Sequence, residues 1–197
     1  PRLFSMYRSA ALQPQLAALP FPSGRQQKAR SAAEKLILQD KVIVLTGGYS
    51  SDVTFAMAAV AQYRKVPFII TTGAADEITE LGADYVFRLN QPVSEYARAL
   101  TEFLQHVVKP KGVVILYEKS LFGQSGSKEF AEQAFELGWK ILMNEGYEAG
   151  TVDFKPLLAP CRPLSNPPGS WLLARHTGFP TSSRLNLLKI RDLYCPK

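Results

Sequence analysis

The sequence predicts an α/β protein whose parallel sheet is covered by helices, and three observations lead to this fold class. Between Ser31 and Ala159, short strands that are apolar throughout alternate with amphipathic helices. Strands of that kind belong to parallel sheets with both faces buried, and intervening helices are what connects parallel strands. Only four of the 14 prolines lie in this stretch, so regular structure is concentrated there.

The first half of the stretch contains two helix and strand pairs. Alanine, leucine and isoleucine recur at helical spacing over 29–37, and an apolar strand is predicted over 42–46. A second helical stripe follows over 53–63, and the run PFIITT over 67–72 has the length and composition of a buried strand. The order of elements so far is helix, strand, helix, strand.

The second half continues the alternation. A strand is predicted over 85–89 (YVFRL), and a helix of about four turns follows from Val93, with Pro92 near its start where a missing N–H costs nothing. The apolar run VVILYE predicts a strand over 113–118. A helix over 130–137 is closed by Gly138 as a C-terminal cap, before a last strand over 140–144. We predict no folded element after Ala159.

Charge limits the partners that the chain is expected to bind. The net charge is +6, but the excess lies at the ends: residues 1–30 have five basic and no acidic side chains, and residues 160–197 have six basic and one acidic. The stretch between them is net acidic and offers no basic groove interleaved with aromatic rings, so we expect no nucleic-acid partner. No apolar run is long enough to span a bilayer, and no signal peptide is visible.

Three loops that follow predicted strands are the candidate sites, because ligands of such sheets bind beyond the carboxyl ends of the strands. Thr46–Asp52 (TGGYSSD) combines two glycines with Ser50 or Ser51 as a helix cap and suits a carboxylate, although a plain tight turn fits it equally. Thr71–Asp76 has hydroxyls and small side chains that leave room for a ligand, or is simply a connection capped by Thr or Asp. Glu118–Ser127 presents Phe122 before a glycine.

The sequence indicates no enzyme, metal site or cofactor. His106 lies beside an apolar helical stripe and His176 in the unpatterned tail, and neither has a neighbour suited to make it a base or a metal ligand. The serines form no GxSxG motif, and the glycines match neither common nucleotide-binding spacing. Cys161 and Cys195 have no metal-binding spacing, and whether they form a disulfide is left open.

The motifs ARSAAEKLILQDKVIVLTGGYSS, VPFIITTGAADEIT, YVFRLNQP, VVILYEKSLFGQSGS and EGYEAGTVDF, in this order, resemble the type I periplasmic binding proteins of the branch that binds leucine-like amino acids. The resemblance covers about residues 24–159. It implies two Rossmann-like lobes, both incomplete in this chain, which close on a small ligand. Residues 28–90 would form part of the first lobe and 91–159 part of the second, between an unpatterned basic segment over 1–27 and an unpatterned Pro-rich basic tail over 160–197.

The resemblance also assigns ligand contacts. Tyr49, Ser50 and Ser51 match the loop that holds the ligand's carboxylate. Thr72, Gly73 and Ala74 match the loop that contacts its α-amino and carboxylate groups, and Phe122 matches an aromatic side chain that closes over the ligand. Ala74 and Phe122 stand where many members have threonine and tyrosine, so the ligand is an amino acid or another small acid or amide.

The function implied by the resemblance is that of a substrate-binding component of an ABC importer, or a fragment of one, at the periplasm or cell surface, with the importer's membrane subunits as partners. A ligand-sensing regulator of the same fold is the alternative, and an α/β enzyme with an anion site at TGGYSSD ranks last. The shifts in charge and proline content at both borders suggest ends translated out of frame or a damaged gene. If these 197 residues are the whole protein, we expect weak or no ligand binding.

Overall fold

The computed structural model describes residues 24–80, 82–159 and 170–174. The chain forms two compact units that meet in the sequence between Pro92 and Val93. Each unit contains its own three-stranded sheet, and within both sheets every pair of neighbouring strands is parallel. The predicted α/β class with parallel strands is therefore confirmed.

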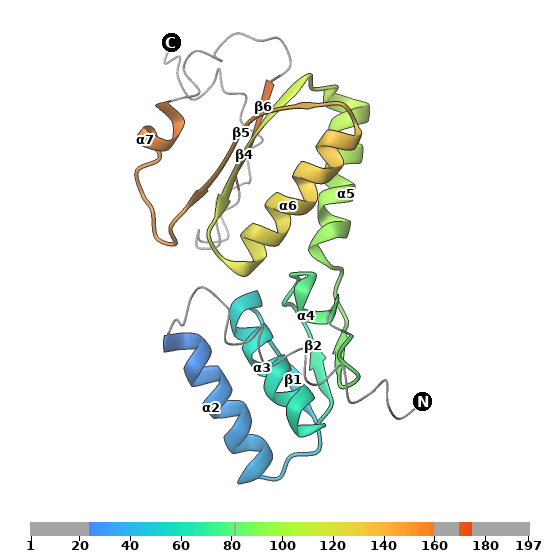
Figure 1. Ribbon diagram of the computed structural model, residues 1–197, viewed down its shortest axis with the longest axis vertical. Coiled ribbons are helices and arrows are strands. Elements are labelled where there is room, and N and C mark those ends of the chain that lie inside the picture. Colours follow the sequence, from blue (N-terminus) through green and yellow to red (C-terminus); the bar gives the residue numbers. More distant parts are fainter. Residues whose placement is uncertain (1–23, 81, 160–169, 175–197) are drawn as a thin grey trace. The chain divides into compact units, whose positions relative to one another are not determined.

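The first unit alternates helices and strands as predicted (Figure 1). Its elements are α2 (Gly24–Leu38), β1 (Leu45–Gly47), α3 (Ser51–Arg64), β2 (Phe68–Ile70), α4 (Glu77–Glu80) and β3 (Val86–Arg88). The strand order is β1-β2-β3. The prediction placed the start of β1 three residues too early, because pairing with β2 begins only at Leu45, opposite Phe68, and Ile43 before it is 86% exposed.

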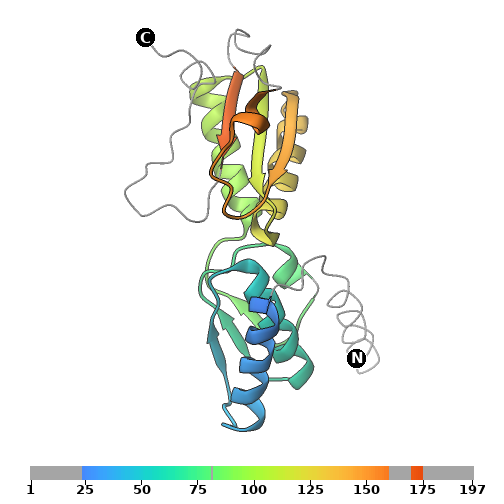
Figure 2. The same cartoon turned by 90° about the vertical axis from the view of Figure 1, so that its left-hand side faces the viewer.

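The core of the first unit lies between its sheet and α3. Leu45, Phe68 and Val86 are in register across the three strands and all are buried. The next row has exposed Thr46 at one end and Phe87, 53% exposed, at the other. Helix α3 is built largely of buried small residues, which lets it approach the strands closely. Helix α2 lies along α3 in both views (Figures 1 and 2).

The second unit is a sheet of order β5-β4-β6 with helices on both faces. Its elements are α5 (Val93–Phe103), the π-helical turn η1 (Leu104–Val108), β4 (Gly112–Glu118), α6 (Leu121–Glu136), β5 (Lys140–Tyr147), α7 (Lys155–Leu158) and β6 (Ser170–Ala174). The prediction of an unpatterned tail is wrong for β6, which pairs with β4 from Gly112 to Leu116. The sequence around SWLLA shows no amphipathic helix that would mark another helix and strand pair, so the pairing with β4 is what reveals this strand.

Alternate residues of β4 supply the cores on the two faces of this sheet. Val113 and Ile115 pack with buried residues of α5, η1, α6 and the turn after α6, where the Phe130 and Trp139 rings are 6.4 Å apart. Val114 and Leu116 point the other way and pack with residues of β5 and of α7, which lies on the face of the sheet opposite α5 and α6 (Figure 2). This alternation is what a strand buried on both sides requires.

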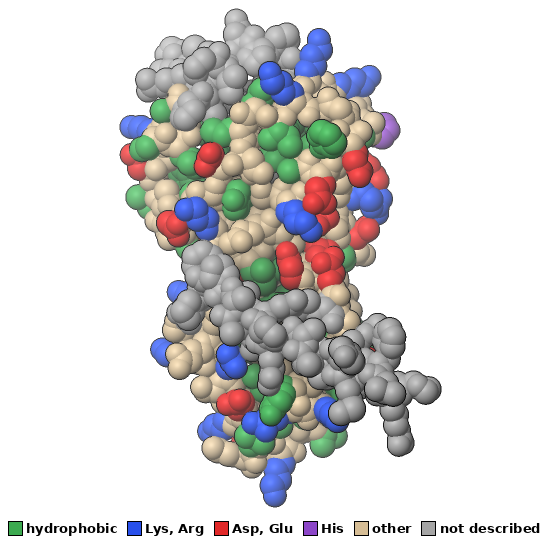
Figure 3. All heavy atoms as spheres, viewed as in Figure 1, with side chains coloured by type: hydrophobic (Ala, Val, Ile, Leu, Met, Phe, Trp, Pro, Cys, Tyr) green, Lys and Arg blue, Asp and Glu red, His purple; other side chains and the backbone are tan. Residues whose placement is uncertain are grey.

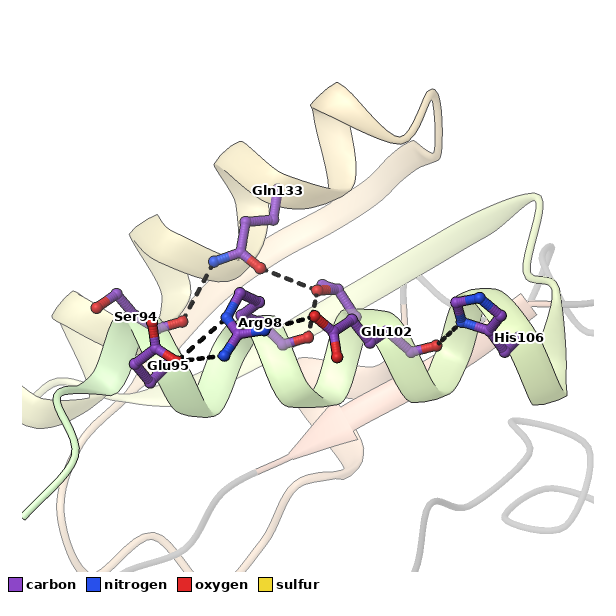
Figure 4. Close-up of polar contacts among 7 residues, drawn as sticks. Ser94, Glu95, Arg98, Glu102, His106 and Gln133 are labelled. Carbon is purple, nitrogen blue, oxygen red and sulfur yellow. Dashed lines mark hydrogen bonds and ion pairs between the residues drawn. The ribbon is translucent and has the colours of Figure 1, made fainter.

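Helix α5 carries a polar contact within its buried stripe. The Thr101 hydroxyl is 2.9 Å from both the Arg98 carbonyl and Oε1 of Gln133 in α6, and Nε2 of Gln133 donates to the Ser94 carbonyl at 3.3 Å (Figure 4). Two aromatic residues of this helix, Tyr96 and Phe103, are instead 41% and 45% exposed. Thr101 occupies the interior position because it can satisfy its hydroxyl there.

The outer face of α5 is charged. Arg98 forms ion pairs with Glu95 and Glu102 one turn to either side, and its hydrogen bonds to those carboxylates raise the pKa of the guanidinium. Figure 3 shows acidic and basic side chains interspersed over this face of the second unit. Because these charges are solvated, we expect them to contribute little to stability. No helix within the described residues is long and apolar enough to cross a membrane.

A Thr101→Val variant is expected to lower the unfolding free energy of the second unit by about 1–2 kcal/mol, because Oε1 of the half-buried Gln133 loses its hydrogen bond. Urea unfolding followed by tryptophan fluorescence measures the loss, since Trp139 and Trp171 both belong to this unit. Adding Gln133→Leu removes the stranded polar group and should recover part of the loss. A Thr101→Val variant as stable as the parent would show that the contact contributes nothing.

Candidate functional site

Two of the three predicted loops meet in the first unit. Residues 48–51 follow β1 and residues 71–76 follow β2, and because the strands are parallel and adjacent, both loops leave the same edge of the sheet. The Gly48 carbonyl accepts the N–H groups of Thr72 and Gly73 at 3.2 and 2.9 Å. The Ala75 N–H donates to Oγ of Ser51 at 3.2 Å. The loops are therefore tied to each other at both ends.

Thr54, in the first turn of α3, lies under both loops. Its side chain is fully buried, and its hydroxyl donates to the Ser50 carbonyl at 2.7 Å. A Cβ placed on Gly48 or on Gly73 would lie 2.6 Å from Oγ1 of Thr54, and Gly48 also has a φ of +89°. Glycine at both positions lets the two loops come close to each other over the start of α3.

The predicted site residues of the first loop differ in exposure to solvent. Tyr49 is 80% exposed, and Ser50 is exposed at the N-cap of α3, where its side chain forms no capping hydrogen bond. Ser51 is only 2% exposed and ties the second loop. The prediction that Ser50 or Ser51 caps the helix is confirmed in position, since Ser50 is the N-cap residue, although its side chain forms no capping hydrogen bond. The hydrogen bond of the Ser51 hydroxyl that the structure describes is the one to Ala75.

The second loop exposes Thr72 and buries Gly73 and Ala74. Together with Tyr49, Ser50 and Ser51, these make six predicted site residues at one edge of one sheet. The first N–H groups of a helix have no partner within the helix and carry its positive dipole end. The edge therefore combines the start of α3, exposed hydroxyls and one exposed aromatic ring, which suits a small anion with an apolar body.

The third predicted loop, 118–127, is helical from Leu121, so its assignment as a loop is wrong. Ser120 caps α6 by accepting the Gly123 N–H on its hydroxyl at 3.2 Å. Phe122 is half-buried in the first turn of α6 and belongs to the second unit. Its contact with a ligand remains a prediction.

Sequence reasoning missed two residues that shape the second loop, Arg88 and Asn90. The Arg88 guanidinium donates to the carbonyls of Ala74 and Ala75 at 2.6 and 2.7 Å, and to the Thr79 hydroxyl at 2.8 Å. Nδ2 of Asn90 donates to the Thr72 carbonyl at 3.0 Å. The available signal was an arginine at the end of an otherwise apolar strand, at the edge where the loops lie.

The residues that the structure describes include no group of three His, Cys, Asp or Glu side chains placed to hold a metal ion. His106 is exposed on η1, where Nδ1 lies 2.8 Å from the Glu102 carbonyl (Figure 4). This contact belongs to the charged face of α5 and is remote in sequence from the two loops.

A family model described as periplasmic binding protein matches residues 23–162, which include both sheets except β6. The chain belongs to the periplasmic binding protein family. The resemblance to type I members is thereby confirmed, as is the expectation of a non-enzymatic binding protein, since the family is one of solute-binding proteins.

Two curated members of the family come from Brucella abortus. The chain is 29% identical over 139 residues to Leu/Ile/Val-binding protein homolog 7. The matched region makes up 66% of this chain and 35% of that protein. It is 27% identical over 143 residues to homolog 8, and this matched region makes up 68% of this chain and 36% of that protein. The chain thus spans about a third of the length of these relatives.

Solved structures of the family share the fold. A solute-binding protein of an ABC transporter from R. palustris, solved in complex with benzoate, has a TM-score of 0.68 and 25% identity over 78% of this chain and 42% of its own. The leucine-binding protein LivK from Thermotoga maritima has a TM-score of 0.64 and 24% identity over 68% of this chain and 38% of its own.

Proposed function

We propose that this chain is the substrate-binding component of an ABC importer, or part of one, and that the edge formed by residues 48–51 and 71–76 is its ligand site. The ligand would be an amino acid or another small acid or amide, and Phe122 is proposed as a further contact on the family resemblance alone. The proposed partners are the importer's membrane subunits, and the proposed location is the periplasm or cell surface, where the family works.

The observation that carries this proposal is the joining of the two loops at the carboxyl edge of β1 and β2, over the start of α3. A carboxylate placed there meets helix N–H groups and the positive end of the dipole. Family membership supports a transport role, and relatives named for Leu/Ile/Val or solved with benzoate support a small carboxylate as ligand.

Amide chemical shifts of the 197-residue chain, titrated with L-leucine, L-valine, benzoate and 4-hydroxybenzoate, test the proposal. We expect the amides of Gly48 and Gly73 to shift with at least one ligand, with a dissociation constant on the order of 1 mM because few groups enclose it. If all four ligands leave these two amides unmoved, the loops are not the site.

Two tyrosines of the first unit provide a matched pair for that titration. Tyr49, in the first loop, and Tyr63, in the last turn of α3, are both exposed, at 80% and 61%, so neither substitution should disturb the core. Tyr49→Ala should weaken the ligand-induced shifts, whereas Tyr63→Ala should leave them unchanged. Equal effects of the two substitutions would contradict a role for the first loop.

A further inference from the structure

The carbonyl groups of the second loop are already used as hydrogen-bond acceptors within the protein. Arg88 donates to those of Ala74 and Ala75 at 2.6 and 2.7 Å, and Asn90 donates to that of Thr72 at 3.0 Å. The Arg88 bonds are charge-assisted, which makes them the stronger kind. Three carbonyls of the loop that would face a ligand thus already have donors.

An ammonium group needs acceptors or a negative charge that it can reach after losing its water. On this loop it would compete with a guanidinium for the same carbonyls and would be repelled by that cation. Nearby carboxylates do not replace them. Asp52 and Asp76 each already take part in an interaction within the protein. Oε2 of Glu77 has no hydrogen-bond partner among the described residues, but it is buried away from solvent.

The groups that remain at this edge favour the opposite charge. The start of α3 attracts anions, the Thr72 hydroxyl is exposed, and the Tyr49 ring offers an apolar surface. A ligand with a carboxylate and an apolar body is satisfied here, while an additional α-amino group would have to share the three carbonyls of the second loop with Arg88 and Asn90.

We propose that this site selects small carboxylates without an amino group, and that Arg88 is the positioning residue that sets this selectivity by holding the carbonyls of Ala74 and Ala75. The proposal rests on the proposed function, because it concerns the same two loops. It replaces the expectation from family resemblance that the second loop contacts an α-amino group.

Three probes with the same branched alkyl group separate the two charges: L-leucine has both, 4-methylpentanoate lacks the amino group, and isoamylamine lacks the carboxylate. The amide shifts of Gly48 and Gly73 in the intact chain report binding. We expect 4-methylpentanoate to bind at least about tenfold more tightly than L-leucine and isoamylamine not to bind, which is a difference of about 1.4 kcal/mol or more.

Arg88→Gln, which removes the cation and two of the donors, should reduce the preference for 4-methylpentanoate over L-leucine at least threefold. Arg88→Lys, which keeps the charge, should retain more of it. Arg64→Gln is the matched control, because Arg64 belongs to the same unit and contacts Tyr63 and Glu34 instead. Should Arg88→Gln not fold, the affinities of the parent chain for 4-methylpentanoate and L-leucine still decide whether the site has the proposed selectivity.

The outcomes distinguish the two proposals. If L-leucine binds as tightly as 4-methylpentanoate or more tightly, the selectivity is refuted and the ligand site stands. If none of the three probes moves the two amides, the selectivity is refuted. If benzoate and 4-hydroxybenzoate also leave them unmoved, the ligand site itself is refuted. An unchanged preference in a folded Arg88→Gln variant would overturn the role of Arg88.

Discussion

A Gly123→Ala variant is expected to lose about 3 kcal/mol or more of the unfolding free energy of the second unit. Gly123 lies in the first turn of α6 and is buried against the end of β4. A Cβ at this position would lie 2.0 Å from the carbonyl oxygen of Glu118 and 3.0 Å from its carbon. These are backbone atoms that cannot rotate away, so the start of α6 would have to move off the strand.

Gly126→Ala, in the same helix, is the control for that substitution. Its Cβ would meet only Cγ1 of Val93 at 3.3 Å, which a small side-chain shift relieves. Alanine also favours the helix by up to about 1 kcal/mol over glycine. Urea unfolding followed by tryptophan fluorescence should therefore show a lower midpoint for Gly123→Ala and an unchanged or higher one for Gly126→Ala. Similar losses for both would contradict the close contact with Glu118.

The second large effect is expected for Gly73→Ala in the first unit, with a loss of about 1–3 kcal/mol. The added Cβ would lie 2.6 to 2.8 Å from three atoms of the Thr54 side chain. Thr54 cannot readily turn aside, because it is fully buried and its hydroxyl is bound to the Ser50 carbonyl. Hydrogen exchange at the Phe68 and Ile70 amides of β2 should become about tenfold faster or more.

A double-substitution cycle with Thr54→Ala identifies the cause of that loss. Thr54→Ala removes two of the three crowded atoms, so the two substitutions together should cost less than the sum of their separate effects. Gly24→Ala, at a glycine with open space around it in the same unit, should have no comparable effect. Strictly additive losses would mean that Gly73 is required for a reason other than Thr54.

The repetition of helix and strand could be predicted from the sequence because it is encoded locally. The helical stripes contain the helical period, and the apolar runs at 67–72 and 113–118 have the length and composition of buried strands; their alternation implies a parallel sheet. The same pattern placed the candidate loops, since a loop that follows a parallel strand must lie at the carboxyl edge of the sheet. Six of the seven predicted site residues lie in these two loops.

The roles of individual side chains at that edge depended on contacts between residues that are distant in the sequence. Ser51 was predicted to face a ligand or cap a helix, but it binds Ala75, 24 positions later. Arg88 holds carbonyls 13 and 14 positions earlier. Such pairs leave no period in the sequence, because they arise only when parallel strands bring separate loops together.

The sequence by itself thus determined the α/β class, the order of most elements and the two loops that follow β1 and β2, because the side-chain period is set by each element's own backbone. The tertiary structure alone decided three things: that β6 joins the sheet beside β4, that α6 begins as early as Leu121, and that the carbonyls of the second loop are bound by Arg88 and Asn90. Each depends on a partner elsewhere in the chain, so only the folded arrangement could show it.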